Sequence, residues 1–223
     1  MTENNLAGLL LAWYEQHGRE LPWRVKGGAH PDPYVILVSE LMLQQTTVKT
    51  VIPYFHRFMK RFPTVKDLAE ATQEEVYFYW QGLGYYPRAR SLHTTARLVM
   101  EKFNGRFPEK REDVLKLKGI GPYTVASFLA LAFNQPETVV DGNVIRVISR
   151  LFRLTEPVSE ILPQIREKAA GLTDRTRPAD YASAIMDLGA MICTPKNPQC
   201  LLCPWQEHCL SKTDPGLEEI PRR

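Results

Sequence analysis

The four cysteines of this 223-residue chain all lie in one short C-terminal segment, and this constrains the fold more than any other feature. Their spacing is Cys193-x6-Cys200-x2-Cys203-x5-Cys209. A disulfide framework normally spreads its cysteines along a secreted chain, whereas four thiolates in one loop can hold a zinc ion or an iron–sulfur cluster. Structural zinc usually joins two close cysteine pairs, and only one close pair is present here. The spacing therefore predicts a metal centre and favours an iron–sulfur cluster, with zinc as the alternative.

The rest of the composition is typical of a globular protein, with 44% hydrophobic and 24% charged residues. No apolar run reaches the roughly 18 residues that a bilayer span requires. The first residues lack the basic region of a signal peptide. We therefore expect a cytoplasmic protein, associated with the nucleoid if it is bacterial, without a membrane partner. The formal net charge of +3 permits nucleic-acid binding but does not predict it.

Helical periodicity dominates the sequence, and no alternating run predicts a sheet. We expect an all-α fold with short connections and a breaker-rich loop at residues 26–33. Two further apolar helices should flank the segment 115–123. The other expected helices span residues 6–17, 34–43, 46–62, 65–70, 73–81, 87–103, 143–151, 163–171 and 178–191.

A glycine-containing turn, Leu117-Lys-Gly-Ile-Gly-Pro-Tyr-Thr, separates those two apolar helices. It is typical of a helix-hairpin-helix, in which Gly119 and Gly121 take positive φ and bring backbone N–H groups close to a phosphate. Lys118 would add a positive charge. Such contacts do not depend on the base sequence, and they position a duplex on the protein. The alternative is an ordinary corner between two helices.

Two acidic residues are candidates for catalysis. Asp141 precedes an expected helix, whose dipole would help to keep it ionised, although it could be only an N-cap. Glu40 lies in a mostly apolar helix, where a carboxylic acid can stay protonated near neutral pH. The alternative is an exposed glutamate without a role. An acid, a carboxylate and a phosphate-binding turn together suggest cleavage of a glycosidic bond.

Over nearly its whole length the chain resembles the endonuclease III superfamily of DNA glycosylases, and within it the adenine-excising MutY enzymes. The resemblance implies a six-helix barrel module at about residues 25–135, and an iron–sulfur module formed by residues 1–24 and 136–223. It also implies a DNA-binding cleft between the modules and a [4Fe–4S] cluster on the four cysteines. The matching segments are Leu21-Pro-Trp-Arg, Ser39-Glu-Leu-Met-Leu-Gln-Gln-Thr, Gly82-Leu-Gly-Tyr-Tyr-Pro-Arg-Ala-Arg, Gly119-Ile-Gly-Pro-Tyr-Thr, Val140-Asp-Gly-Asn and the cysteine loop.

The resemblance implies a monomeric, monofunctional enzyme of base excision repair. It would remove adenine opposite 8-oxoguanine or guanine in double-stranded DNA. Glu40 would protonate adenine N7, and Asp141 would stabilise or trap the oxocarbenium-like sugar. Asn143 and Tyr123 would orient these groups. Bifunctional relatives carry a lysine at position 123, whose amine attacks the sugar and forms an imine. Tyr123 has no amine and cannot form this imine.

The same resemblance implies which other side chains contact the DNA. Gln45 and Tyr85 would enter the base stack and fill the space left by the flipped base, with Leu43 as support. Trp23 and Arg24 would line the base pocket. As isolated apolar residues, Tyr85, Leu43 and Trp23 could instead belong to the core.

The sequence departs from the family pattern at two places. Family members usually continue into a second domain that helps to recognise 8-oxoguanine, and this sequence ends at Arg223. It is either the catalytic half of a longer protein or a naturally short relative. Ser183 stands where relatives often carry a glutamate or glutamine, which puts a water-positioning role there in doubt.

Three other functions remain open. A thymine-excising mismatch glycosylase can also carry tyrosine at position 123, but thymine has no N7 for Glu40 to protonate. An endonuclease III-like glycosylase with lyase activity is opposed by Tyr123. A non-enzymatic DNA-binding or electron-transfer module would need only the cysteine loop, and would leave Glu40 and Asp141 without a role.

Overall fold

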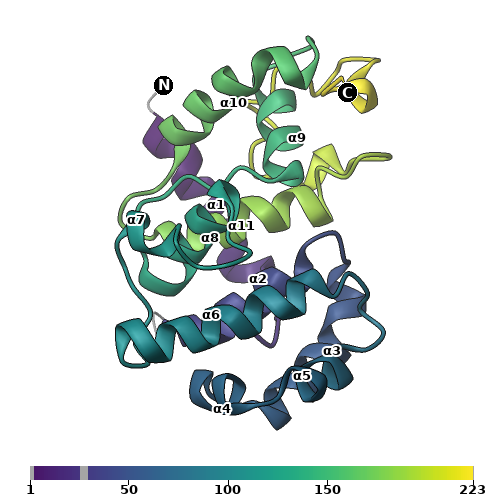
Figure 1. Ribbon diagram of the computed structural model, residues 1–223. Helices are drawn as coiled ribbons and strands as arrows, with labels where there is room; N and C mark the ends of the chain where they lie inside the picture. Colours follow the sequence, from purple (N-terminus) through teal and green to yellow (C-terminus); the bar gives the residue numbers. More distant parts are fainter. Residues whose placement is uncertain (1–2, 26–29, 223) are drawn as a thin grey trace. The chain divides into compact units, whose positions relative to one another are not determined.

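The computed structural model in Figure 1 describes residues 3–25 and 30–222. Within these ranges it contains eleven α-helices, two short 3-10 helices and no strand, so the all-α prediction is confirmed. Residues 26–29 of the predicted breaker-rich loop lie outside the described ranges. The helices are α1 (Glu3–His17), α2 (Pro33–Leu43), α3 (Val48–Arg61), α4 (Val65–Glu70), α5 (Gln73–Trp80), α6 (Pro87–Phe103), α7 (Arg111–Val114), α8 (Pro122–Phe133), α9 (Gly142–Leu151), α10 (Val158–Leu172), α11 (Pro178–Met191), η1 (Cys200–Leu202) and η2 (Leu217–Glu219).

Local capping signals explain most of the helix boundaries. Helix α4 begins after a capping box, in which Thr64 and Asp67 satisfy each other's backbone N–H groups. Helices α2, α6 and α11 each begin with a proline, which needs no hydrogen-bond acceptor there. The predicted start of α10 at Pro163 is wrong, because the helix begins at Val158 and continues through that proline.

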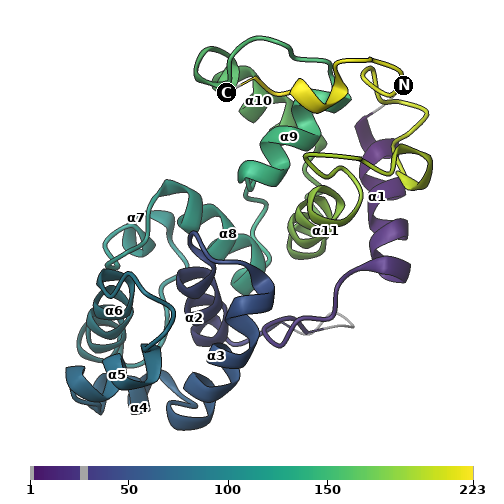
Figure 2. The same ribbon diagram turned by 90° about the vertical axis from the view of Figure 1, so that its right-hand side faces the viewer.

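The chain divides into two compact units, Glu20–Phe133 and Met1–Arg19 with Asn134–Arg223. These limits lie close to the predicted module boundaries, and the assignment of a barrel and a cluster module to them stays a prediction. In the first unit α2 packs against α3, α6 and α8 (Figure 2). A helix that is apolar on all sides is stable only when it is covered, and residues 36–42 of α2 are all buried.

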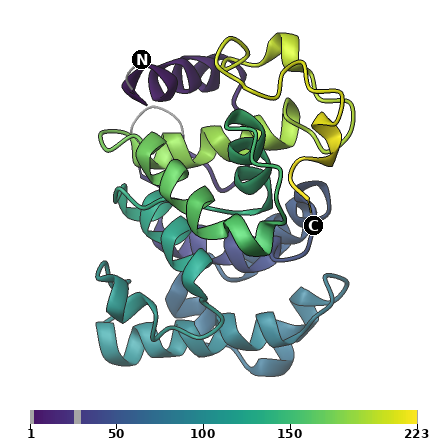
Figure 3. The same cartoon turned by 90° about the horizontal axis from the view of Figure 1, so that it is seen from above.

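In the second unit α9 packs against α10 and α11, and α1 contacts the same two helices. The carboxylate of Asp187 on α11 is fully buried and accepts hydrogen bonds from the backbone N–H (2.8 Å) and the Nε (2.7 Å) of Arg19. Figure 3 shows α1, in purple, beside the C-terminal segment in yellow-green. There the indole of Trp205 donates to the carbonyl oxygen of Leu6 at 2.8 Å. These contacts join the two ends of the sequence into one unit.

The turn between α7 and α8 is fixed by two neighbours in its own unit. Thr95 on α6 accepts from the backbone N–H of Lys118 at 2.8 Å and donates to its carbonyl oxygen at 3.1 Å. The Gln44 side chain donates to the carbonyl oxygen of Gly119 at 3.3 Å. Gly119 has a φ of 78°, and an added Cβ would lie 2.6 Å from the Cβ of Ser91. Gly121 lacks a positive φ, so that part of the prediction is wrong, and a Cβ there would meet open space.

The two glycines should therefore respond differently to alanine. Gly119→Ala should cost about 1–3 kcal/mol, because it strains a left-handed residue and clashes with α6. Gly121→Ala should change stability by less than about 0.5 kcal/mol. Denaturant unfolding of both variants measures the difference. Equal costs would contradict this description of the turn.

Candidate functional site

Glu40 is buried within α2, with only 9% of its surface exposed. The interpretation as an exposed glutamate without a role is therefore wrong. The hydroxyl of Ser127 on α8 lies 2.5 Å from Glu40 Oε2 and donates to it. Ser127 is itself fully buried, and its hydroxyl also lies 3.2 Å from the carbonyl oxygen of Thr124. Burial next to a hydroxyl gives this carboxyl group a fixed polar partner inside an apolar unit.

The Ser127 hydroxyl can serve both protonation states of that carboxyl group. It donates to Oε2 when Glu40 is ionised. When Oε2 is protonated, Ser127 can accept from it and donate to the carbonyl oxygen of Thr124 instead. Sequence reasoning missed Ser127, because nothing within an apolar helix marks one serine as the partner of a residue 87 positions away.

Asp141 is the N-cap of α9, as one of the two interpretations of the sequence expected. Its Oδ1 accepts from the backbone N–H of Val144 at 2.7 Å. Its Oδ2 accepts from the side-chain amide of Asn143 at 3.0 Å. The two predicted catalytic residues of this unit therefore lie in contact. The N-terminal position on a ten-residue helix also places the carboxylate at the positive end of the helix dipole.

Arg146, one turn further along α9, connects that pair to the cysteine segment. Its Nη2 donates to Asn143 Oδ1 at 2.9 Å and to the carbonyl oxygen of Gly189 at 2.7 Å. Its Nε donates to the carbonyl oxygen of Cys193 at 2.7 Å. Gly189 lets α9 and α11 approach closely, since an added Cβ would lie 2.6 Å from the Cβ of Asn143. Sequence reasoning missed Arg146, whose partners lie on α9 itself and in residues 189–193, more than forty positions away.

The predicted base-stack residues lie in tight turns at the ends of helices. Gln45, which follows α2, is exposed and has a left-handed φ of 55°. Tyr85, which precedes α6, is 68% exposed with a φ of 45°. Non-glycine residues rarely adopt this conformation, and it is frequent at functional sites. The core-packing alternative is therefore wrong for Tyr85.

The other predicted base-contacting residues are less exposed. Leu43 is half-buried and packs against the core of its unit. Trp23 is buried, with its ring centroid 5.3 Å from that of Phe55, as the core-packing alternative expected. Arg24 is half-buried. Tyr123, the second residue of α8, and Lys118 in the turn are exposed.

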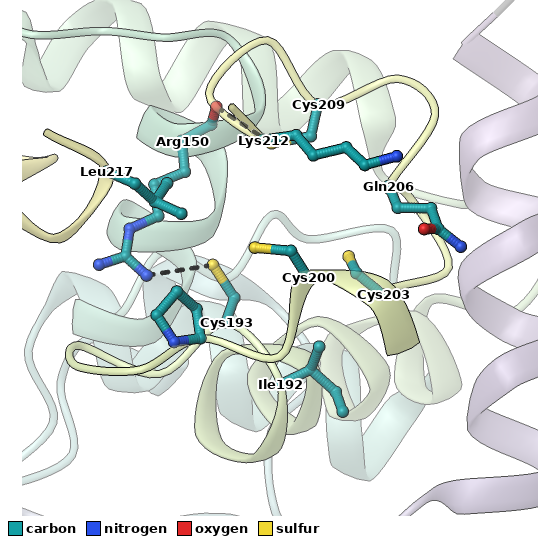
Figure 4. A pocket seen from close by; sticks show the side chains of 10 residues that line it. Arg150, Ile192, Cys193, Cys200, Cys203, Gln206, Cys209, Lys212 and Leu217 are labelled. Carbon is teal, nitrogen blue, oxygen red and sulfur yellow. Dashed lines mark hydrogen bonds between the residues drawn. The ribbon is translucent and has the colours of Figure 1, made fainter. Parts of the chain in front are cut away.

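The four cysteines line one pocket, with Arg150, Gln206 and Lys212 among the surrounding residues (Figure 4). None of the four forms a disulfide. Arg150 is buried and anchors the segment by donating to the carbonyl oxygens of Thr194 (2.6 Å), Pro195 (3.0 Å) and Ile220 (2.9 Å). Its Nη1 lies 3.6 Å from the sulfur of Cys193, the dashed contact in Figure 4. Four thiols around one pocket, with a cation beside them, fit a thiolate-bound cluster.

The chemistry of these thiols fits a bound metal as well. Burial raises the pKa of Cys203 to about 12, and raises the pKa values of Cys193 and Cys209. Without a metal the buried thiols therefore favour the protonated form, and coordination would replace their protons. Positive charge on Arg150 acts in the opposite direction on Cys193 by favouring its thiolate.

Comparison with known proteins decides between iron and zinc. Residues 193–209 match the family described as the iron–sulfur binding domain of endonuclease III. This range begins and ends at a cysteine and contains all four. The cofactor is a [4Fe–4S] cluster, and the zinc alternative is set aside. Cys193, Cys200, Cys203 and Cys209 would hold it.

The purified protein should contain about four irons per chain and absorb near roughly 400 nm. Cys203→Ser should lower both, because it removes one of the thiols that line the pocket. Ser211→Ala is the matched control, since Ser211 is buried close by and its hydroxyl has no partner among the described residues. Elemental analysis and absorbance measure the outcome. One zinc and no iron in the native protein would contradict the assignment.

Proteins named adenine DNA glycosylase are similar to most of this chain. The Rattus norvegicus protein is 45% identical over 207 residues, and the Homo sapiens protein is 43% identical over 220 residues. These matches cover 90% and 96% of this chain but 40% of each relative, so the chain spans about two fifths of their length. The structure of a thermostable thymine-DNA glycosylase is similar over 94% of this chain and 96% of that chain, with a TM-score of 0.82 and 30% identity.

No helix within the described ranges is long and apolar enough to span a membrane.

Residues 38–170 match the family described as HhH-GPD superfamily base excision DNA repair protein. This match contains Glu40, the turn at Gly119 and Asp141, and it covers more than half of the sequence. The chain therefore belongs to the HhH-GPD superfamily of base excision DNA repair proteins.

Proposed function

We propose that this chain is a monofunctional adenine DNA glycosylase, which hydrolyses the N-glycosidic bond of adenine mispaired with 8-oxoguanine or guanine. The buried carboxyl group of Glu40, with Ser127 as its hydrogen-bond partner, carries the proposal. Such a group can deliver a proton to a base that is otherwise a poor leaving group. The names of the rat and human relatives support adenine as that base.

In this mechanism Glu40 donates its proton to N7 of the flipped adenine. The Ser127 hydroxyl contacts Oε2 and fixes the orientation of the carboxyl group for this transfer. After the transfer Glu40 is ionised, and donation from Ser127 stabilises the new charge. Protonation weakens the bond between N9 and the sugar, and the neutral base leaves.

Asp141 would stabilise the positive charge that develops on the sugar as the base departs. Val144 and Asn143 donate to its two oxygens and hold the carboxylate in place. Water then attacks the sugar, either directly or to displace a covalent bond to Asp141. The proton that the water loses restores the ionised Glu40 to its acid form, and an abasic site remains. Tyr123 supplies no amine, so the strand is not cleaved through an imine.

Double-stranded DNA would be held mainly through its phosphates. The backbone N–H groups near Gly119 and Gly121 are the proposed donors, with Lys118 adding charge. Open space at Gly121 leaves room for close approach of a phosphate. Gln45 and Tyr85 would enter the base stack beside the flipped nucleotide.

The [4Fe–4S] cluster, when bound, supplies structural support for the C-terminal loop. We infer that the protein acts as a monomer in the cytoplasm, at the nucleoid if it is bacterial.

A thymine mismatch glycosylase is the second candidate. The similar thymine-DNA glycosylase structure matches this chain over nearly the full length of both chains, whereas the adenine glycosylase relatives extend well beyond it. The identity of 30% with that structure is lower than the 43–45% with the adenine glycosylases. Thymine also offers no N7 to an acid at Glu40. Adenine is therefore the favoured substrate.

The purified protein should release adenine from duplexes in which adenine faces 8-oxoguanine or guanine. It should not release thymine opposite guanine. Because Tyr123 cannot form an imine, the abasic strand should stay intact until it is heated or treated with alkali. Base release and strand cleavage under single-turnover conditions measure both points. Thymine release without adenine release would establish the second candidate, and efficient borohydride trapping would contradict the monofunctional assignment.

Glu40→Gln should slow adenine release by at least about a hundredfold, the usual scale for general acid catalysis, while duplex binding persists. Ser127→Ala should slow release by about tenfold, the effect of losing a hydrogen bond to a charged group. Ser149→Ala is the matched control, because Ser149 is buried and its hydroxyl has no partner among the described residues. Single-turnover rates measure all three variants. Native rates for Glu40→Gln, or equal rates for the two serine variants, would contradict the proposed roles.

A further inference from the structure

Arg88 is a buried arginine whose guanidinium group contacts two separate turns. It lies in the first turn of α6, and only 5% of its surface is exposed. Its Nη1 donates to the carbonyl oxygens of Leu41 (3.2 Å), Met42 (2.9 Å) and Gln44 (2.5 Å). These are backbone groups at the C-terminus of α2 that the helix itself leaves unpaired.

The other guanidinium nitrogen holds the turn before α6. Arg88 Nη2 donates to the carbonyl oxygens of Leu83 (3.1 Å) and Gly84 (3.3 Å). One planar group therefore ties the end of α2 to residues 83–84, about forty positions away in the sequence. A lysine could not reproduce this, because it offers a single point charge in place of a planar fork of donors.

Each turn presents an exposed left-handed residue directly after a carbonyl that Arg88 holds. Gln45 follows Gln44, and Tyr85 follows Gly84. Left-handed backbone is unfavourable at a non-glycine residue and persists only when the surrounding contacts hold it in place. The hydrogen bonds from Arg88 to the carbonyl oxygens of Gln44 and Gly84 hold the backbone directly before Gln45 and Tyr85 in place.

Gln44 extends this arrangement to the third turn of the same unit. Its carbonyl oxygen accepts from Arg88, and its side-chain amide donates to the carbonyl oxygen of Gly119. The turns at 44–46, 83–86 and 118–121 are therefore held in register by a continuous chain of hydrogen bonds. Arg88 is the member of that chain with the most partners.

We propose that Arg88 is a positioning residue that sets Gln45 and Tyr85 as a pair, so that both side chains enter the base stack together. This inference rests on the proposed glycosylase function. Arg88 is buried under the two turns and would act on the reaction only through the residues it holds. Loss of the pair would leave phosphate binding intact and would impair extrusion of the base.

Arg88→Lys in the cluster-containing protein tests the proposal. A duplex with adenine opposite guanine would carry 2-aminopurine beside the mispaired adenine, because the fluorescence of this base analogue rises when it unstacks. With saturating native protein the fluorescence should rise. With Arg88→Lys it should rise less than half as much, and single-turnover adenine release should fall about tenfold or more, as expected for misplaced contact groups. Affinity for a fully paired duplex should change less than about twofold, because phosphate contacts are kept.

Arg90→Lys is the matched control, since Arg90 is exposed two positions further along α6 and donates to the hydroxyl of Tyr77. It should behave as the native protein does. Thr46→Val is a second variant in case Arg88→Lys does not fold, because it removes a hydroxyl that accepts from Arg88 at 3.2 Å and donates to the carbonyl oxygen of Gln44 at 3.3 Å, the same carbonyl group that Arg88 holds. It should lower the fluorescence rise in the same direction.

Native fluorescence and release with Arg88→Lys would overturn the proposal, as would native values with Thr46→Val if Arg88→Lys does not fold. A native protein that binds the duplex without any fluorescence rise would also overturn it, because no side chain would then enter the stack. Failure of the proposed function is distinguishable from these outcomes. It would appear as a fluorescence rise with the native protein that is not followed by adenine release.

Discussion

The burial of α2 is the constraint on which the Glu20–Phe133 unit depends. Its sequence offers no polar face, so α3, α6 and α8 must cover it from several sides. Two consequences matter for function. Glu40 is carried into the interior with the apolar residues around it, where it needs a polar partner and obtains Ser127. The helix also ends abruptly inside the unit, and Arg88 satisfies the carbonyl groups left at that end.

Helix α9 has a central place in the other unit, because residues along its length contact both the Asp141–Asn143 pair and the cysteine segment. Asp141 caps its first turn, and Arg146 contacts both Asn143 and the backbone of Cys193. Arg150, one turn later, holds the segment that leads from Cys193 to the remaining cysteines. The candidate carboxylate and the cluster loop are therefore supported by the same short helix. Loss of the cluster would be expected to disturb both.

Local sequence signals predicted most helix boundaries. They failed for side chains whose roles depend on contacts with residues far away in the sequence. The capping box at Thr64 and the prolines at helix starts determined boundaries that could be expected in advance. The proline within α10 was misleading, because the remaining turns of that helix compensate for one lost hydrogen bond. Ser127, Arg88 and Arg146 gave no signal, since each has partners that lie 42 to 87 positions away in the sequence. Gly121 resembled Gly119 in sequence, and the two differ in the positive φ of Gly119 and in its packing against Ser91.

Proton transfer from Glu40 to N7 of adenine is the central claim, and 7-deazaadenine tests it most directly. This analogue pairs as adenine does but carries a carbon in place of N7, so it cannot accept the proton. Single-turnover release should be measured for adenine and for 7-deazaadenine opposite guanine, at protein concentrations that saturate both duplexes. The account predicts that both duplexes bind with similar affinity and that only adenine is released. Release of 7-deazaadenine at a rate comparable to that of adenine would contradict it.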